Sequence, residues 1–318
     1  MSLAPYVRIL GRGPGRSRSL TLDEAQEAMT LMLRGDAAPE AVGALLMLLR
    51  MKGETPEEIA GFARAACAAL PALPRSDLDW PSYAAGRTRG LPWFLLSARL
   101  VARAGHSVLM HGFNGSDGAV RAGLAPAEIA TVTDPAECEQ ILGTHGIAYM
   151  PLETLSPQLF ALLRLRDVLS LRSCVNTVCR MFNPGGAAAS VQGVFHPSYR
   201  GLQTEAAQHL GLKRQTVIKG GGGEFERHVG KEIATFGLRN GASWQGVAPA
   251  LCDETRRLDD GDTDPAHLAA LWAGERDDAF ATAIVTGTAA LALETLGHSR
   301  AEDLAHSLWT GRHRARAA

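Results

Sequence analysis

Residues 1–73 carry apolar side chains at spacings of three and four, which is the period of a helix with one buried face. The stretch 21–34 opens with a threonine and two acidic residues and is followed by Gly35, so it has signals for both helix ends. Further helices are predicted over about 39–51 and 55–70. We therefore expect residues 1–73 to form a small all-helical N-terminal domain.

From residue 83 onward the pattern changes to short apolar runs beside glycines. These runs cover 107–110, 131–134, 147–150 and 216–218. Short apolar runs that alternate with helical stretches indicate a mostly parallel sheet flanked by helices. Residues 74–318 are therefore predicted to form a larger α/β domain that binds a ligand. The helices expected to cover this sheet near the end of the chain lie at about 265–272, 279–296 and 301–309.

Three glycine-rich turns, at 86–90, 111–118 and 219–223, are the expected ligand-binding loops. Ligands of parallel sheets bind in the loops that leave the carboxyl ends of the strands. Glycine in such a loop lets backbone N–H groups approach an anion closely.

Charge and composition bear on the protein's partners, on the state of its cysteines and on its location. A net charge of −1 gives no overall field that would favour nucleic acid or a membrane surface. The five cysteines show no zinc-ligand spacing and are expected to be reduced thiols. No run approaches 18 uninterrupted apolar residues, so we expect a soluble, cytoplasmic protein with no export signal and no membrane partner.

Arginine supplies most of the positive charge and clusters near both ends of the chain. Such clusters are usually solvated, although arginine also binds phosphate and carboxylate through two parallel hydrogen bonds. The cluster before the first predicted helix is Arg8, Arg12, Arg16 and Arg18, and the cluster in the tail is Arg312, Arg314 and Arg316.

Four motifs occur in the order found in one enzyme family. The stretch 49–61, preceded by Leu22-Asp23-Glu24-Ala25, closely resembles the N-terminal helical domain of anthranilate phosphoribosyltransferases and their nucleoside phosphorylase relatives. Residues 110–112, 146–150 and 166–184 resemble later motifs of that family. The resemblance implies the family's fold, with helices near 160–180 completing the helical domain, and a homodimer formed through that domain.

The family's pyrophosphate-binding turn is altered in this chain. Where the enzymes have Gly-Thr-Gly-Gly-Asp, this chain has Ala84-Ala85-Gly86-Arg87-Thr88-Arg89-Gly90, so the two arginines replace bare backbone amides. In the next loop Met110 and Phe113 replace the family's lysine and asparagine, and Asn114 follows. The predicted phosphate-binding or nucleic-acid-binding residues in these two loops are Gly86, Arg87, Thr88, Arg89, His111, Gly112 and Asn114.

The family's magnesium motif is altered as well. Phe225 stands at the position of the family's aspartate, Glu226 matches its glutamate, and Glu224 is a second weak candidate ligand. We expect no cofactor, and magnesium only if the protein is catalytically active. The preceding Lys219, Gly220, Gly221, Gly222 and Gly223 have the composition of an anion cradle, with a turn that serves only the topology as the alternative.

Arg166, Arg172 and Asn176 match family residues near the aromatic-acid substrate. If the protein is active, these residues are the predicted acceptor-binding set. Taken without the resemblance, helical arginines beside Asp167 are more often surface or paired residues, and a lone histidine such as His111 is more often structural.

The run Lys219 to Arg227 resembles a divergent branch of the family that keeps the fold without the tryptophan-pathway active site. For that branch the resemblance implies nucleic-acid binding along a basic groove of the dimer. Our first interpretation is therefore a weakly catalytic or noncatalytic protein that binds nucleic acid, single-stranded or double-stranded. The alternative is an active transferase that uses phosphoribosyl pyrophosphate with anthranilate or another aromatic acceptor. A structural partner protein is a third class, for which the sequence gives no positive signal.

Overall fold

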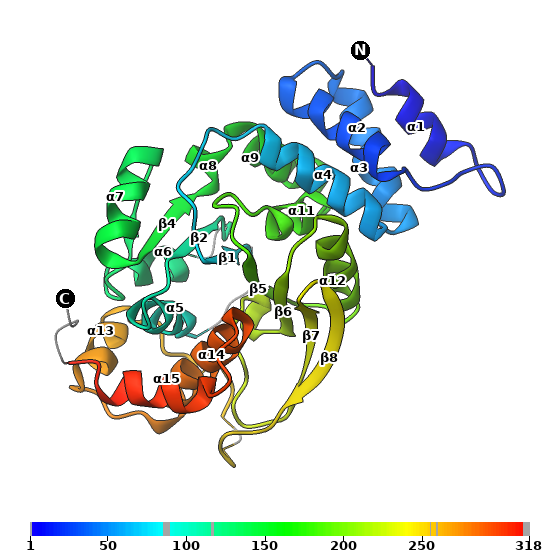
Figure 1. Cartoon of the computed structure of the whole chain (residues 1–318). Coiled ribbons are helices and arrows are strands. Elements are labelled where there is room, and N and C mark those ends of the chain that lie inside the picture. The colour runs from blue at the N-terminus through cyan, green and yellow to red at the C-terminus, as the bar shows by residue number, and fades with distance from the viewer. Residues whose placement is uncertain (1, 85–89, 116–117, 255, 259, 314–318) are drawn as a thin grey trace.

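The computed structural model describes residues 2–84, 90–115, 118–254, 256–258 and 260–313, and shows a helical part beside an α/β part (Figure 1). The helical part contains α1 (Ala4–Gly11), α2 (Leu22–Arg34), α3 (Pro39–Lys52) and α4 (Pro56–Ala68). The cap at the start of α2 and the cap at the start of α4 are both reciprocal capping boxes. The predicted small helical domain and larger α/β domain are therefore confirmed.

Helix α1 corrects the sequence prediction, which places Arg8 before the first helix. Arg8 lies in the last turn of α1, and the helix packs against α3. Leu3, which caps the start of the helix, and Leu10, which lies within it, are buried in the helical core. Eight residues are too few for a clear periodic signal, so it is burial against α3 that stabilises this helix.

The α/β part is built on one eight-stranded sheet with strand order β3-β4-β2-β1-β5-β6-β7-β8. Neighbouring strands are parallel from β3 to β6 and antiparallel from β6 to β8. The strands are β1 (Leu78–Ser82), β2 (Val108–Gly112), β3 (Ala130–Thr131), β4 (Ile147–Pro151), β5 (Ala189–Val194), β6 (Arg214–Lys219), β7 (Ile233–Arg239) and β8 (Ala242–Ala248).

Strands β2, β4 and β6 lie where the apolar runs predict them, and β3 is shorter than predicted. Two central strands have no apolar run to reveal them. Strand β1 has the sequence LDWPS, with an aspartate and a proline, and β5 has the sequence ASVQGV. The antiparallel hairpin β7–β8 is also absent from the sequence prediction. Burial of polar groups that find partners across the sheet explains why periodicity misses β1 and β5.

The sheet separates two hydrophobic cores. One face packs against α5 (Phe94–Arg103) and α14 (Ala279–Leu296), and α15 (Ala301–Thr310) packs on these two helices. The other face packs against the helical part and against α11 and α12. The remaining helices are α6 (Ala119–Leu124), α7 (Pro135–His145), α8 (Leu152–Leu155), α9 (Pro157–Arg164), α10 (Arg166–Leu169), α11 (Val175–Met181), α12 (Tyr199–His209) and α13 (Ala266–Ala273).

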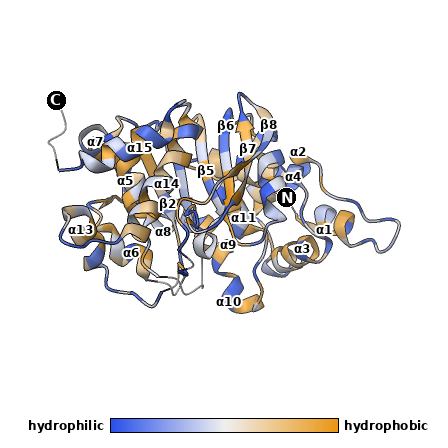
Figure 2. Ribbon diagram, turned by 90° about the horizontal axis from the view of Figure 1, so that it is seen from below, coloured by the Kyte–Doolittle hydropathy of each residue, from blue (hydrophilic) through white to orange (hydrophobic). Residues whose placement is uncertain are grey.

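Helix α14 has the length and hydropathy of a membrane span, and 67% of its apolar window is buried inside the fold. It packs against α5, α15, β5 and β6. Figure 2 shows this hydrophobic helix within the α/β part, beside α5. Because most of it is buried by other elements of the fold, α14 is a core helix of the α/β part.

Gly61 allows α4 to pack directly on α2. A Cβ at this position would lie 2.2 Å from the carbonyl oxygen of Leu22 and 2.8 Å from the Cβ of Ala25. We predict that Gly61→Ala lowers the free energy of unfolding by about 1–3 kcal/mol, because the two helices must separate. Urea unfolding monitored by circular dichroism measures this change.

Gly143→Ala is the matched control, because Gly143 is also helical and a Cβ there would meet nothing within 4 Å. It should stabilise the protein by up to about 1 kcal/mol through helix propensity. Equal effects of the two substitutions would contradict the proposed close contact between α2 and α4.

Candidate functional site

Four parallel strands end at the same edge of the sheet. Ser82 of β1 is in register with Gly112 of β2, and Val194 of β5 is in register with Lys219 of β6. Strand β1 also pairs with β5. The loops that follow these strands therefore meet at the carboxyl edge, where parallel sheets bind ligands.

A groove of about 1060 Å³ runs between this edge and the helical part. It is lined from the end of α3, from the segment around α10 and α11, and from the end of β5 and the start of α12. The lining residues are Arg50, Met51, Gly53, Glu54, Arg166, Ser170, Leu171, Arg172, Ser173, Asn176, Thr177, Arg180, Val194, Phe195, His196, Tyr199 and Gln203.

Positive charge dominates the described lining of this groove. Arg50, Arg166, Arg172 and Arg180 face one acidic residue, Glu54. Burial raises the pKa of the Glu54 carboxyl above its usual value, so the one acidic group is less readily ionised than an exposed glutamate. The groove is therefore suited to an anionic ligand.

Arg180 is the buried arginine at the base of the groove, and the sequence interpretation does not include it. Its guanidinium donates to the carbonyl oxygens of Tyr83 at 2.9 Å, Gly193 at 3.1 Å and Asn176 at 3.1 Å. Burial lowers the pKa of Arg180, and the nearby Glu224 carboxylate acts in the opposite direction. Arg180 ties α11 to β5 and to the loop after β1.

The three predicted acceptor-binding residues come together in space. Arg166, Arg172 and Asn176 line the groove, and they also line an adjoining cavity of about 330 Å³ beside Phe113 and Gly115. The carbonyl oxygen of Arg172 accepts a hydrogen bond of 2.6 Å from Arg50 of the helical part. Sequence separation hides this convergence, because more than a hundred residues lie between Arg50 and Arg172.

Glu224 and Glu226, the two candidate metal ligands, are each 1% exposed and contact backbone amides. Glu224 Oε1 accepts from the Ala84 amide at 2.9 Å and from Asn114 Nδ2 at 3.0 Å. Glu226 Oε2 accepts from the Phe94 amide at 2.8 Å, at the start of α5. Both carboxylates therefore hold loops in place, and their assignment as metal ligands stays a prediction.

The glycine run packs tightly around these glutamates. A Cβ at Gly220 would lie 1.6 Å from the carbonyl oxygen of Glu224, and a Cβ at Gly193 would lie 2.0 Å from the carbonyl carbon of the same residue. The amides of Gly220, Gly221 and Gly223 donate to backbone carbonyls. These contacts favour the topological turn over the anion cradle, while Lys219 is exposed at the end of β6.

His111 and Gly112 serve the interior of the sheet. His111 is fully buried, with Nδ1 2.7 Å from the Tyr83 hydroxyl and Nε2 3.0 Å from Asp79 Oδ1. A Cβ at Gly112 would lie 2.1 Å from the Ser82 carbonyl oxygen. The remaining predicted phosphate-binding residues, Gly86, Arg87, Thr88 and Arg89, lie outside the described residues.

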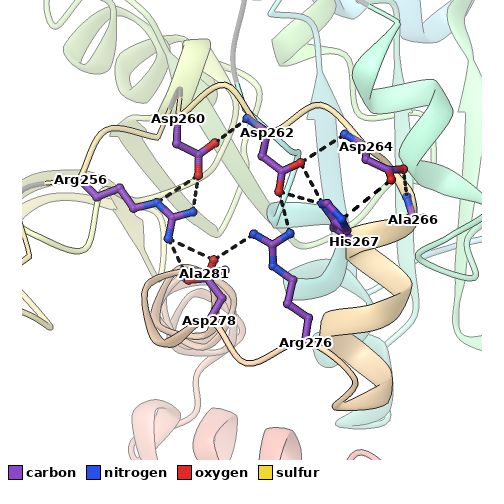
Figure 3. Close-up of polar contacts among 9 residues, drawn as sticks. All are labelled: Arg256, Asp260, Asp262, Asp264, Ala266, His267, Arg276, Asp278 and Ala281. Atoms are coloured by element: carbon purple, nitrogen blue, oxygen red, sulfur yellow. Dashed lines mark hydrogen bonds and ion pairs between the residues drawn. The ribbon is translucent and has the colours of Figure 1, made fainter.

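A polar network joins residues of the segment between β8 and α14 (Figure 3). Asp262 contacts His267 at 2.9 Å and Arg276 at 2.7 Å. Asp278 contacts Arg256 at 3.1 Å and Arg276 at 3.3 Å. The network orders the segment that contains Leu258.

Leu258 connects this segment to the two glycine-rich turns of the site. Its carbonyl oxygen would lie 2.4 Å from a Cβ at Gly90, and its Cδ1 would lie 2.8 Å from a Cβ at Gly221. Larger residues at either glycine would displace Leu258, so the network and the turns depend on one another for their positions.

The chain is similar to proteins of one family over most of its length. Residues 4–69 match the helical bundle domain of the glycosyl transferase family. Anthranilate phosphoribosyltransferase from Rubrobacter xylanophilus is 32% identical over 214 residues, which are 65% of this chain and 62% of that protein. The corresponding protein from Deinococcus radiodurans is 30% identical over 230 residues, 70% of this chain and 67% of that protein. The match to the first of these relatives thus spans less than two thirds of its length.

Solved structures share the fold. Anthranilate phosphoribosyltransferase from Thermus thermophilus aligns with a TM-score of 0.78 and 22% identity, covering 98% of this chain and 94% of the other. The enzyme from Saccharomyces cerevisiae in complex with PRPP and Mg aligns with a TM-score of 0.74 and 14% identity, covering 98% and 95%. The resemblance seen in the sequence motifs is therefore confirmed at the level of family and fold.

The network in Figure 3 should contribute stability that depends on pH. Burial acts to raise the pKa of Asp262 and of Asp278, but hydrogen bonds from the surrounding cations and amides outweigh it and lower both values below the usual 3.8. The stabilisation is therefore complete above pH 3.8, the usual pKa of an aspartate. It is lost as the pH falls through the lower pKa values that the two aspartates have in the folded protein.

We predict that Arg276→Gln lowers the free energy of unfolding by about 1–2 kcal/mol at pH 6, because it removes contacts to two carboxylates. The difference in free energy of unfolding between the variant and the unsubstituted protein should shrink as the pH falls below 3.8. Urea unfolding at a series of pH values measures it, with the exposed Arg300→Gln as control. A difference that is constant with pH would count against this role of the network.

Proposed function

Because the chain belongs to the anthranilate phosphoribosyltransferase-like family, we propose that it binds phosphate-bearing ligands in its arginine-lined groove without efficient phosphoribosyl transfer. Nucleic acid is the leading ligand. One observation carries this proposal: the groove is lined by four arginines, while Glu224 and Glu226 of the predicted metal motif are buried outside its lining and accept backbone amides.

The positions of the carboxylates argue against magnesium chemistry at this site. Magnesium takes oxygen ligands in octahedral geometry and is usually held by one or two carboxylates together with substrate phosphates. One oxygen of each carboxylate is already engaged, Glu224 Oε1 by the amide of Ala84 and Glu226 Oε2 by the amide of Phe94. At most the other oxygen of each side chain could reach such an ion. The described residues contain no group of three or more histidine, cysteine or acidic side chains that could hold a metal ion.

The groove combines the two features that bind single-stranded nucleic acid. Arginines attract the phosphates, and aromatic faces stack on bases. Phe195 and His196 lie at the end of β5, with ring centroids 4.9 Å apart, and Tyr199 begins α12 beside them. All three residues line the groove together with its arginines. This arrangement supports a strand lying along the groove, with little preference for sequence.

The homodimer and the cytoplasmic location belong to the same proposal. Dimer formation through the helical part would place two grooves in one particle, and the family resemblance supports it. Two linked grooves would bind a long strand more tightly than one groove does, because the second contact becomes intramolecular.

Fluorescence anisotropy of labelled single-stranded and double-stranded oligonucleotides, measured across a salt series, tests the proposal. We expect affinity to fall steeply with salt. Replacing Arg166 and Arg172 together by glutamine should lower the slope of log affinity against log salt by about 1.4 for a single strand, since each lost phosphate contact contributes about 0.7.

Arg8→Gln is the matched control, because Arg8 is exposed on α1, outside the groove. It should leave both the affinity and the slope unchanged. Salt-insensitive binding, or an equal loss in the Arg8 variant, would remove the groove as the nucleic-acid site.

The convergence of Arg166, Arg172 and Asn176 on the cavity of about 330 Å³ favours one alternative, an active phosphoribosyltransferase. Relatives in this family are named for that activity, and the Saccharomyces cerevisiae enzyme has been solved in complex with PRPP and Mg. The discriminating assay is pyrophosphate release from phosphoribosyl pyrophosphate with anthranilate and magnesium. We expect no release above background, and turnover abolished by Asn176→Ala would establish the alternative instead.

A further inference from the structure

A second cavity lies on the face of the sheet that α4, α11 and α12 cover. Its volume is about 260 Å³, below the range of about 300–1,000 Å³ that is usual for drug-sized ligands, so it suits a smaller molecule. It is separate from the groove and shares no described lining residue with it. The cavity is lined by Arg64, Cys67, Asp79, Met181, Asn183, Ser190, Gln192, Leu210 and Leu212.

The floor of this cavity offers hydrogen-bond acceptors. Asp79, Ser190 and Gln192 are each 1% exposed. Ser190 Oγ donates to Asp79 Oδ2 at 2.7 Å, and Gln192 Nε2 donates to Ser190 Oγ at 3.2 Å. Gln192 Oε1 has no hydrogen-bond partner among the described residues. A buried acceptor without a partner is destabilising, so a ligand that donates an N–H group here would be stabilised.

The contacts of the Asp79 carboxylate are with a histidine and a serine. Its Oδ1 lies 3.0 Å from His111 Nε2, and its Oδ2 accepts from Ser190 Oγ at 2.7 Å. No lysine or arginine among the described residues lies within ion-pair distance of Asp79.

The mouth of the cavity has the opposite charge. Arg64 is exposed there and donates to the His209 carbonyl at 3.3 Å, with no ion-pair partner in the described part of the chain. Met181, Leu210 and Leu212 supply apolar walls. A negative floor, apolar walls and a positive mouth are complementary to a short molecule with a cation at one end and an anion at the other.

We propose that this cavity binds a small zwitterion of the amino-acid class. Its ammonium group donates to Asp79 and to Gln192 Oε1, and its carboxylate pairs with Arg64. An ammonium group in this position supplies the missing donor for Gln192 Oε1 and places a cation beside the Asp79 carboxyl group in the cavity lining. The inference does not depend on what the groove binds.

Isothermal titration calorimetry and thermal unfolding of the whole protein test the proposal. The probes are the common α-amino acids, β-alanine and 4-aminobutyrate. We expect at least one of them to bind with one-site stoichiometry and to raise the melting temperature with concentration. Glycine betaine, a zwitterion without an N–H donor, should not bind. Absence of binding by every probe at millimolar concentration would overturn the proposal and leave a water-filled cavity.

Gln192→Met tests the floor. The substitution removes the unpartnered acceptor, together with the hydrogen bond from Nε2 to Ser190 Oγ, at similar side-chain size, and affinity should fall at least about tenfold. Gln215→Met is the matched control, because Gln215 is a buried glutamine on the neighbouring strand and does not line the cavity. Unchanged affinity in the Gln192 variant, or an equal loss in the Gln215 variant, would refute the assignment.

Arg64→Gln tests the mouth. The substitution should lower the affinity for the tightest-binding zwitterion about tenfold. It should leave unchanged the weaker affinity for the corresponding amine without a carboxylate. Arg64 is exposed, so its replacement should leave the stability of the protein nearly unchanged, which thermal unfolding of the free variant checks. Equal effects on the zwitterion and on the amine would contradict the assigned orientation.

Discussion

The carboxylates of Glu224 and Glu226 hold together the loops on which the candidate site depends. Glu224 bonds to the amide of Ala84, after β1, and to Asn114, after β2. Glu226 bonds to the amide of Phe94, where α5 begins. Hydrogen bonds from backbone amides to buried carboxylates are strong, because the acceptor is charged and water is excluded. Three loops from separate parts of the chain are therefore fixed by one short segment.

The close approach of this segment to the sheet requires glycine. Gly193 and Gly220 lie against the backbone of Glu224 at distances that leave no room for a side chain. Phe225 points the other way and packs edge-on against Trp80, with ring centroids 5.5 Å apart. Alternation along an extended segment thus sends its carboxylates toward the loops and its aromatic ring into the core behind the sheet. The segment 224–226 therefore joins the loops at the carboxyl edge of the sheet to the core behind it.

The two faces of the sheet differ in chemistry. The face against α5 and α14 is lined by apolar side chains such as Trp80 and Val191. The opposite face carries the hydrogen-bonded row of His111, Asp79 and Ser190. Tyr83, which bonds to His111 through its hydroxyl, accepts from Arg180 of the groove through its carbonyl. One chain of polar contacts therefore reaches from the groove to the small cavity behind the sheet.

The sequence by itself determined the helices with strong local signals, the parallel character of the sheet and the family motifs. The capping boxes at Thr21 and Thr55 and the apolar runs of β2, β4 and β6 are set by neighbours a few residues away. Periodicity missed α1 because it is short, and missed β1 because the polar partners of Asp79 lie on other strands.

Only the tertiary structure decided what the candidate residues do. It brought Arg50 to Arg172, buried Arg180 beneath the groove, and gave Glu224 an amide partner 140 positions away in the sequence. It also left Gln192 Oε1 without a partner at the floor of a cavity. These outcomes depend on which distant groups meet when the loops close. Composition, spacing and local propensity carry no information about that meeting, because a side chain's partners across the sheet are set by packing of the whole fold.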